Sequence, residues 1–276
     1  MENYRILPLR ENLWAISELE KTVMYVINGR DRVLLLDTGF GTVPLRRVVG
    51  SLCGDKPVVV VNSHAHPDHS FGNNQFGCVC VGRFDEPFSH RLPDAEELAK
   101  TRDMFFGEYL SAGGVLPNWT PGPAPRISVL QEGDTIDLGG FVLRVLETPG
   151  HTLGSVSLLE ESCRWLFTGD LILTWEVWGQ LETSAALRVY WHTLERLARL
   201  ERHVDTVFPA HWGEKDNPLH FPPCELPPEI LPIYAEGTGR IVRGEDTGEP
   251  YDFWGREMRC SRFHIGGMVF DPERIG

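Results

Sequence analysis

Residues 64 to 69, HAHPDH, place three histidines and an aspartate within six positions. The segment follows the apolar run PVVVV at 57 to 61, which has the length and β-branching of a buried strand. Imidazole and carboxylate groups are the usual protein ligands of Zn²⁺, Fe²⁺ and Mn²⁺. A chain of this composition would contain the pattern by chance in roughly one case in a thousand. The segment therefore predicts a metal site.

One turn can hardly complete two coordination shells, so this site needs further ligands at the ends of later strands. His151 in TPGHT, Asp170 in LFTGD and His211 in FPAH each close an apolar, strand-like segment. We expect these three residues to complete the site. The other histidines lack that placement, and surface or packing roles are expected for them: His90, His192, His203, His220 and His264.

The order of these motifs resembles the metallo-β-lactamase-fold hydrolase superfamily, in particular its glyoxalase II-like and lactonase-like binuclear members. The resemblance covers Trp14 to His211 and rests on Asp-Thr-Gly at 37 to 39, then HAHPDH, PGHT, FTGD and a final PAH. It implies an α/β fold in which two mixed β-sheets flanked by helices form a four-layer αβ/βα sandwich. The metals would lie at one edge between the sheets.

The resemblance also implies a role for each residue of the site. Three residues would bind a first divalent ion, three a second, and one would bridge the two ions. These are His64, His66 and His151 for the first ion, Asp68, His69 and His211 for the second, and Asp170 as the bridge. Asp37 is similar to the aspartate that orients a ligand side chain by hydrogen bonding, and capping its own turn is the alternative. Zn²⁺ is the expected ion, with Fe or Mn as alternatives.

Two cations roughly 3.5 to 4 Å apart can share a water and lower its pKa towards neutrality. Asp68 and Asp170 are the predicted catalytic residues, and Asp68 would also orient the hydroxide or receive its proton. We expect hydrolysis of a small ester, thioester or lactone. An iron-dependent oxidoreductase of the persulfide dioxygenase type is the alternative from another reaction class. A third hypothesis is a metal-stabilised binding protein without catalysis.

The elements that must position these residues are short apolar runs. Runs at 22–27, 32–37, 57–61 and 78–81 predict strands, the turn residues 28–31 join the first two, and helical spacing between 42 and 53 predicts a crossover helix. From residue 127 to 169 further strand-like runs follow. Residues 184–201 have the spacing of an amphipathic helix, and 205–211 that of one more strand. Two strand-rich halves divided near residue 126 suit two sheets.

We expect one metallo-β-lactamase-like domain over residues 1–212, with an insert at about 84–126. Within the insert, a helix from near Asp94 to about Leu110 precedes a Gly/Pro-rich loop, which is either a lid or a connector. Residues 213–276 are expected to form a tail that packs on the same domain. The tail does not look helical, which argues against the glutathione thioester specificity of glyoxalase II.

Four aromatic residues are candidates for the walls of a substrate pocket: Trp119, Trp175, Trp178 and Tyr190. Aromatic walls suit an acyl chain or a lactone ring. Packing in the core is the alternative for each of them. Tyr190 would otherwise be an oxyanion donor, as in lactonase relatives.

Composition restricts the partners. A formal net charge of −13 opposes attraction to nucleic acid, so the expected partner is a small-molecule substrate. Six cysteines without a C-x-x-C pair are typical of a reducing compartment. The first residues show no signal-peptide pattern and no apolar segment reaches membrane-spanning length, so a cytoplasmic protein without membrane contact is expected. The sequence does not predict the oligomeric state.

Overall fold

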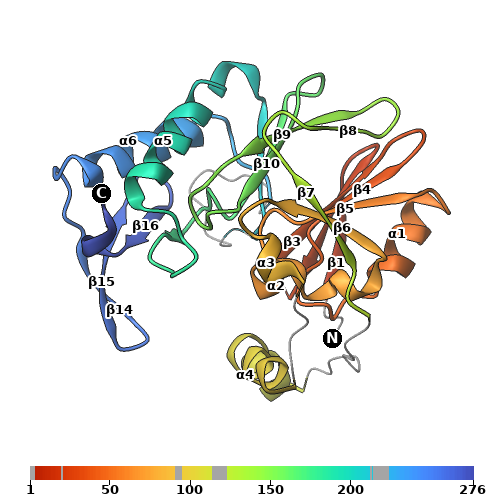
Figure 1. Cartoon of the computed structure of the whole chain (residues 1–276), viewed down its shortest axis with the longest axis horizontal. Helices are drawn as coiled ribbons and strands as arrows, with labels where there is room; N and C mark the ends of the chain where they lie inside the picture. The colour runs from red at the N-terminus through yellow and green to blue at the C-terminus, as the bar shows by residue number, and fades with distance from the viewer. Residues whose placement is uncertain (1–3, 20, 91–94, 114–122, 212, 214–223) are drawn as a thin grey trace. The chain divides into compact units, whose positions relative to one another are not determined.

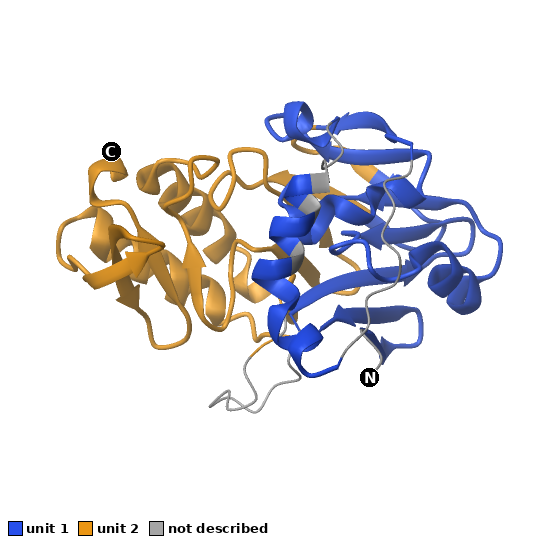
Figure 2. Ribbon diagram, turned by 90° about the horizontal axis from the view of Figure 1, so that it is seen from below, with its two compact units in different colours: residues 1–130, 136–142 blue, residues 131–135, 143–276 orange. Residues whose placement is uncertain are grey.

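The structure is a computed structural model, and it describes the chain except residues 1–3, 20, 91–94, 114–122, 212 and 214–223. The described residues form two compact units, one of residues 1–130 with 136–142 and one of 131–135 with 143–276 (Figure 2). Each unit has a hydrophobic core of its own. The predicted domain boundary at residue 212 stays a prediction. No described helix combines the length and the apolar character needed to cross a bilayer.

The first unit is built on a seven-stranded sheet with the strands in chain order (Figure 1). The first four strands pair antiparallel and the last four parallel. The predicted strands at 22–27, 32–37, 57–61 and 78–81 are confirmed. The strands are β1 Tyr4–Arg10, β2 Leu13–Glu18, β3 Thr22–Asn28, β4 Val33–Leu36, β5 Val58–Val61, β6 Cys78–Gly82 and β7 Arg126–Leu130.

Helices connect the parallel strands of this sheet, because a parallel pair cannot be joined by a tight turn. The predicted crossover helix is α1, Leu45–Cys53, which buries Val48 and Val49 in the same cluster as Val33, Leu35 and Val60. After β5 come α2 Pro67–Ser70 and the 3-10 turn η1 Phe71–Gln75, and after β6 come α3 Glu86–Ser89 and α4 Ala95–Ser111. Consequently, the segments that follow β4 and β5 leave the sheet at the same edge.

In the second unit, strands pair in the order β13, β11, β10, β9. The pair β11–β13 is parallel, and the other two pairs are antiparallel. The predicted amphipathic helix is α5, Leu187–Ala198, which precedes the 3-10 turn η2 Glu201–His203. The strands are β9 Val142–Glu147, β10 Val156–Glu160, β11 Trp165–Gly169 and β13 Thr206–Pro209, and the chain changes unit at β8, Thr135–Asp137.

The C-terminal segment contains regular structure that its sequence does not suggest. The expectation of a non-helical tail is wrong, because residues 230–242 form helix α6, Ile230–Val242. Pro232, Gly237 and Gly239 lower its intrinsic helix propensity, and packing of its apolar face against the core compensates. After α6 the tail adds β14 Glu249–Phe253, β15 Arg256–Arg262, β16 Gly267–Phe270 and the turn η3 Pro272–Arg274. These strands pair with β12, Glu176–Trp178, in the order β12, β16, β15, β14.

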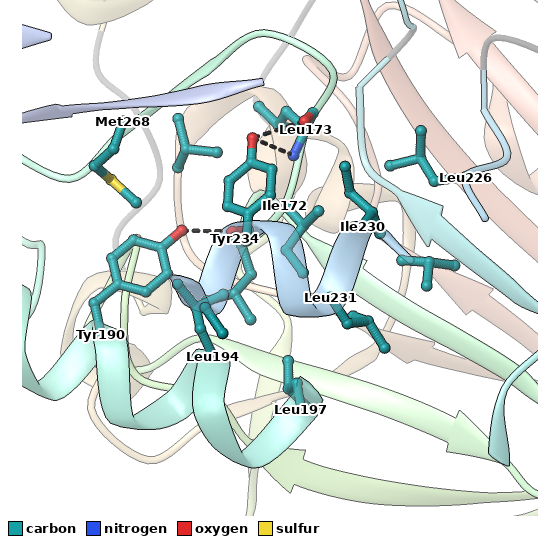
Figure 3. Close-up of a cluster of buried hydrophobic side chains, with 14 of the residues drawn as sticks. Ile172, Leu173, Tyr190, Leu194, Leu197, Leu226, Ile230, Leu231, Tyr234 and Met268 are labelled. Carbon is teal, nitrogen blue, oxygen red and sulfur yellow. Dashed lines mark hydrogen bonds between the residues drawn. The ribbon is translucent and has the colours of Figure 1, made fainter. Parts of the chain in front are cut away.

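Two buried tyrosines anchor the segment that follows β11 in this core (Figure 3). The hydroxyl of Tyr190 on α5 donates to the carbonyl oxygen of Leu171 at 2.6 Å, and that of Tyr234 on α6 donates to the carbonyl oxygen of Leu173 at 2.7 Å. Burial raises the pKa of both phenols, so both stay protonated donors. The backbone directly after Asp170 is therefore held from two helices.

Candidate metal centre

The histidine-rich turn of the first unit begins where β5 ends. Pro67 occupies the first helical position of α2, where its missing N–H costs nothing. The backbone N–H of Ala65 donates to the carboxylate of Asp85 at 2.8 Å. These two constraints fix the path of the chain through residues 64–69.

The side chains of this turn lie in contact with one another. Nε2 of His64 is 3.0 Å from Nδ1 of His66, and Nε2 of His69 is 3.2 Å from Oδ2 of Asp68. The rings of His64 and His69 have centroids 4.1 Å apart. Histidines packed this closely would repel one another if protonated, whereas neutral imidazoles can share a cation.

Asp37 lies between the ends of β4 and β5 and holds two parts of the turn. Its carboxylate accepts hydrogen bonds from the backbone N–H and the hydroxyl of Ser63, at 2.6 and 2.8 Å. Its Oδ2 also lies 3.0 Å from Nδ1 of His69. Because a carboxylate only accepts, Nδ1 of His69 carries the proton and Nε2 is the nitrogen directed at Asp68.

A buried amide network also supports the turn, and the sequence analysis missed it. The side chain of Asn62 donates to the carbonyl oxygen of His69 at 2.9 Å, and that of Asn73 donates to Asn62 at 2.7 Å. The backbone N–H of Thr38 donates to the same carbonyl oxygen of His69 at 2.8 Å. Local sequence gives no sign of this network, because its members come from separate segments of the chain.

Glu18, at the end of β2, is a second residue that sequence reasoning missed. Its carboxyl accepts from the backbone N–H of Phe40 at 2.7 Å and of Thr42 at 3.0 Å, and it also bonds to the hydroxyl of Thr42. Complete burial raises the pKa of Glu18 to about 7, although these hydrogen bonds act in the opposite direction. Glu18 thus holds the turn that follows Asp37.

The second unit brings its three predicted residues together from separate segments. Asp170 directly follows β11 and His211 lies two residues after β13, and these parallel strands end at the same edge of the sheet. Nε2 of His211 lies 2.9 Å from Oδ2 of Asp170, and Nε2 of His151 lies 3.6 Å from the same oxygen. Two imidazoles therefore face one carboxylate oxygen.

His151 is held in one tautomer by the backbone of β12. Its Nδ1 lies 2.8 Å from the carbonyl oxygen of Trp178, which can only accept, so Nε2 is the nitrogen that faces Asp170. The preceding residue, Gly150, has no space for a side chain, because a Cβ there would lie 2.6 Å from the ring of Tyr190. The position of His151 thus depends on close packing against α5.

The four candidate wall residues have different surroundings. The ring centroid of Trp175 lies 5.5 Å from that of His211, and the ring of Trp178 packs against Phe253 at 5.0 Å. Tyr190 is fully buried in the core, with its hydroxyl bonded to Leu171, which is the packing role that the sequence left open. Trp119 lies outside the described residues.

Among the described residues, the remaining histidines do not join either group of candidate ligands. Those that the structure describes are exposed: His90, His192, His203 and His264. His220 lies outside the described residues. Nδ1 of His192 lies 3.0 Å from the carboxylate of Glu195 one helical turn away, which is a surface role.

The donor set of each unit fits metal ions that prefer nitrogen and oxygen ligands. His69 and His151 each have one ring nitrogen held by a protein oxygen and the other directed at a carboxylate, which is the arrangement typical of metal-binding histidines. The groups supplied are imidazole and carboxylate, which suit Zn²⁺, Fe²⁺ and Mn²⁺. The residues present therefore fit the expected ions.

The chain is similar to known proteins in both sequence and structure. Residues 19–211 match the model of the Metallo-beta-lactamase superfamily. The acyl-coenzyme A thioesterase MBLAC2 of Bos taurus is 30% identical over 212 residues, which cover 69% of this chain and 72% of that protein. Hydroxyacylglutathione hydrolase of Rhodospirillum rubrum is 27% identical over 57% of this chain and 49% of its own length. The structure of a metallo-beta-lactamase family protein from Thermus thermophilus superposes with a TM-score of 0.58 at 20% identity, covering 89% of this chain and 86% of that one.

Proposed function

Because the chain belongs to the metallo-beta-lactamase superfamily and is a metallo-hydrolase of that superfamily, we propose that it hydrolyses acyl thioesters with two divalent metal ions. The chain has the metallo-beta-lactamase fold, as its sequence predicts, with mixed sheets and flanking helices. The observation that carries the proposal is the pair of ligand clusters, each with one histidine, His69 or His151, whose tautomer is fixed by a protein oxygen.

We assign the ligands in two groups, joined by one bridge. His64, His66 and His151 would hold one ion, and Asp68, His69, Asp170 and His211 would hold the other. Asp170 would serve both ions, which is consistent with its two histidine neighbours at 2.9 and 3.6 Å. Zn²⁺ is the proposed ion, since imidazole and carboxylate ligands suit it.

When bound, the two ions supply Lewis acidity and lower the pKa of a shared water towards neutrality. The chain's own groups then position the reactants. Asp68 orients the attacking water and accepts its proton, while Asp37 keeps His69 in the tautomer that binds metal. The anchored backbone after Asp170 keeps the bridging carboxylate in place. No serine or cysteine nucleophile is needed.

The thioesterase relative supports a thioester substrate over an oxygen ester or a lactone, because the match covers 72% of that protein. The argument against a glutathione thioester fails, because it depended on a non-helical tail and α6 is a helix. We nevertheless propose a coenzyme A thioester, since the match covers 72% of the coenzyme A thioesterase and 49% of the glutathione hydrolase.

The test compares hydrolysis of acyl-coenzyme A by the wild-type protein and by the variants Asp68→Ala and His66→Ala, with and without a chelator. The variants should lose most of the chelator-sensitive activity, whereas His203→Ala, a change at an exposed histidine, should keep it. Metal analysis should find about two zinc ions per chain in the wild type. Full chelator-sensitive hydrolysis by His66→Ala would contradict the proposal. One iron per chain with oxygen uptake on a persulfide would favour the oxidoreductase alternative.

A further inference from the structure

The turn between β14 and β15 places a tryptophan where the backbone is left-handed. Phe253 pairs with Arg256 across the turn, and Trp254 and Gly255 between them have φ angles of +50° and +81°. Such two-residue turns favour Asn-Gly or Asp-Gly, because a bulky L-residue at positive φ is strained. The side chain of Trp254 is also 65% exposed. The chain therefore accepts both backbone strain and an exposed apolar ring at one position.

Trp254 belongs to an aromatic group that we call the tip cluster, made of Trp178, Phe253 and Trp254. The ring centroids of Trp254 lie 4.4 Å from Phe253 and 5.8 Å from Trp178. Leu181 and Tyr251 pack against the buried residues beneath the hairpin. Figure 1 labels the two strands, β14 and β15, that carry the turn. Phe253 is buried and Trp178 half-buried, so the cluster backs one exposed indole, that of Trp254, with two packed rings.

The tip cluster is joined to the candidate metal centre through Trp178. The carbonyl oxygen of that residue holds Nδ1 of His151 at 2.8 Å, while its ring packs on Phe253 and Trp254. Trp178 thus orients a proposed metal ligand through its backbone carbonyl, while its indole ring packs in the tip cluster. The cluster is therefore connected to a proposed metal ligand through a single residue.

We infer that the tip cluster binds the hydrocarbon part of the acyl group and that Trp254 determines specificity for acyl chain length. This inference rests on the proposed thioesterase function. The two sides of an acyl-coenzyme A differ, because the acyl side is apolar and the coenzyme side is polyanionic. Of the charged residues beside the turn, Asp252 and Glu257 are acidic and Arg256 is basic, so these three residues do not favour phosphates. Exposed strained residues concentrate at ligand-binding sites, which agrees with this role.

The experiment measures kcat/KM for octanoyl- and acetyl-coenzyme A. In Trp254→Gly the octanoyl-to-acetyl ratio should fall about tenfold, mainly through a higher KM for the octanoyl substrate. Trp254→Phe keeps an aromatic ring and should stay closer to the wild-type ratio. Val189→Ala removes part of an exposed apolar side chain on α5 and should leave both rates unchanged. Glycine adopts positive φ without strain, so Trp254→Gly should melt at a temperature no lower than the wild type.

Binding of octyl-coenzyme A, a thioether that cannot be hydrolysed, separates this inference from the proposed function. Calorimetry should give a Kd about tenfold weaker for Trp254→Gly than for the wild type. If the wild-type protein hydrolyses no thioester, the proposed function fails and the binding result decides the inference alone. Equal Kd values, no binding by the wild type, or an unchanged octanoyl-to-acetyl ratio in Trp254→Gly would each overturn it.

Discussion

The carboxylate of Asp37 lies 3.0 Å from Nδ1 of His69 and fixes the tautomer of that imidazole. Asp37 has a left-handed backbone, with φ of +64°, and also bonds to Ser63. The aspartate thus joins the ends of two neighbouring strands and one candidate metal ligand. Loss of its negative charge should affect metal binding before it affects the fold.

Asp37→Asn is therefore expected to weaken metal binding by about 10- to 100-fold, because removal of a partner that orients a ligand typically has that effect. The asparagine keeps one acceptor oxygen but presents an NH₂ group to its other donors. Competition with a chromophoric chelator measures the change in affinity. Asp55→Asn, at an exposed position of the same unit, should bind metal as the wild type does. Wild-type affinity in Asp37→Asn would show that the Asp37–His69 contact does not support the site.

Because of Glu18, the free energy of unfolding should fall as the pH rises from 4.5 to about 7. Burial raises its pKa from an ordinary value of 4.5 to about 7, so the folded state binds more protons than the unfolded state between these values. This contribution is complete below pH 4.5 and is lost as the pH rises to about 7, for a total of about 3 kcal/mol.

Urea unfolding at several pH values in chelator measures this effect. Glu18→Gln cannot titrate, so its free energy of unfolding should fall less than that of the wild type between pH 4.5 and 7. Glu161→Gln, at an exposed position, should keep the wild-type slope. Equal slopes in the wild type and in Glu18→Gln would refute the assigned pKa.

Gly150→Ala should destabilise the second unit and disturb His151. The added Cβ would lie 2.6 Å from the ring of Tyr190 and 2.7 Å from the side chain of Leu171. Such overpacking typically costs about 1–3 kcal/mol. A matched change, Gly50→Ala in α1, meets no atom within 4 Å and should raise stability by about 0.5–1 kcal/mol. Thermal unfolding and kcat/KM measure both variants, and a fully active, stable Gly150→Ala would argue against this packing.

Tyr190→Phe separates the two roles that the sequence left open for this residue. Loss of the hydroxyl leaves the buried carbonyl oxygen of Leu171 without its 2.6 Å hydrogen bond and should cost about 1–3 kcal/mol of stability. Turnover per folded molecule should fall only modestly, because the hydroxyl lies in the core and Tyr234 still anchors the backbone after Asp170 at Leu173. A large fall in kcat with unchanged stability would instead support an oxyanion role.

The sequence predicts most of the elements, because buried strands are nearly continuous apolar runs and α1 and α5 have regular helical spacing. It also predicts which side chains gather in each unit, since they follow strands, and their assignment as metal ligands stays a prediction. It fails for α6, where Pro232 and Gly237 obscure the pattern and packing determines the helix. Glu18 and Asn62 were missed for another reason. Their partners are distant in sequence, so nothing local distinguishes them from surface residues.

The two phenol anchors, Tyr190 and Tyr234, come from different helices and reach the chain one and three residues beyond Asp170. A shift of either helix would therefore move the backbone beside the carboxylate that we propose as the bridge between the two ions. Directed evolution confined to positions around a bound substrate would not alter these two hydrogen bonds. Libraries that vary residues at the α5–α6 interface should change the activity without changing any residue that contacts the substrate.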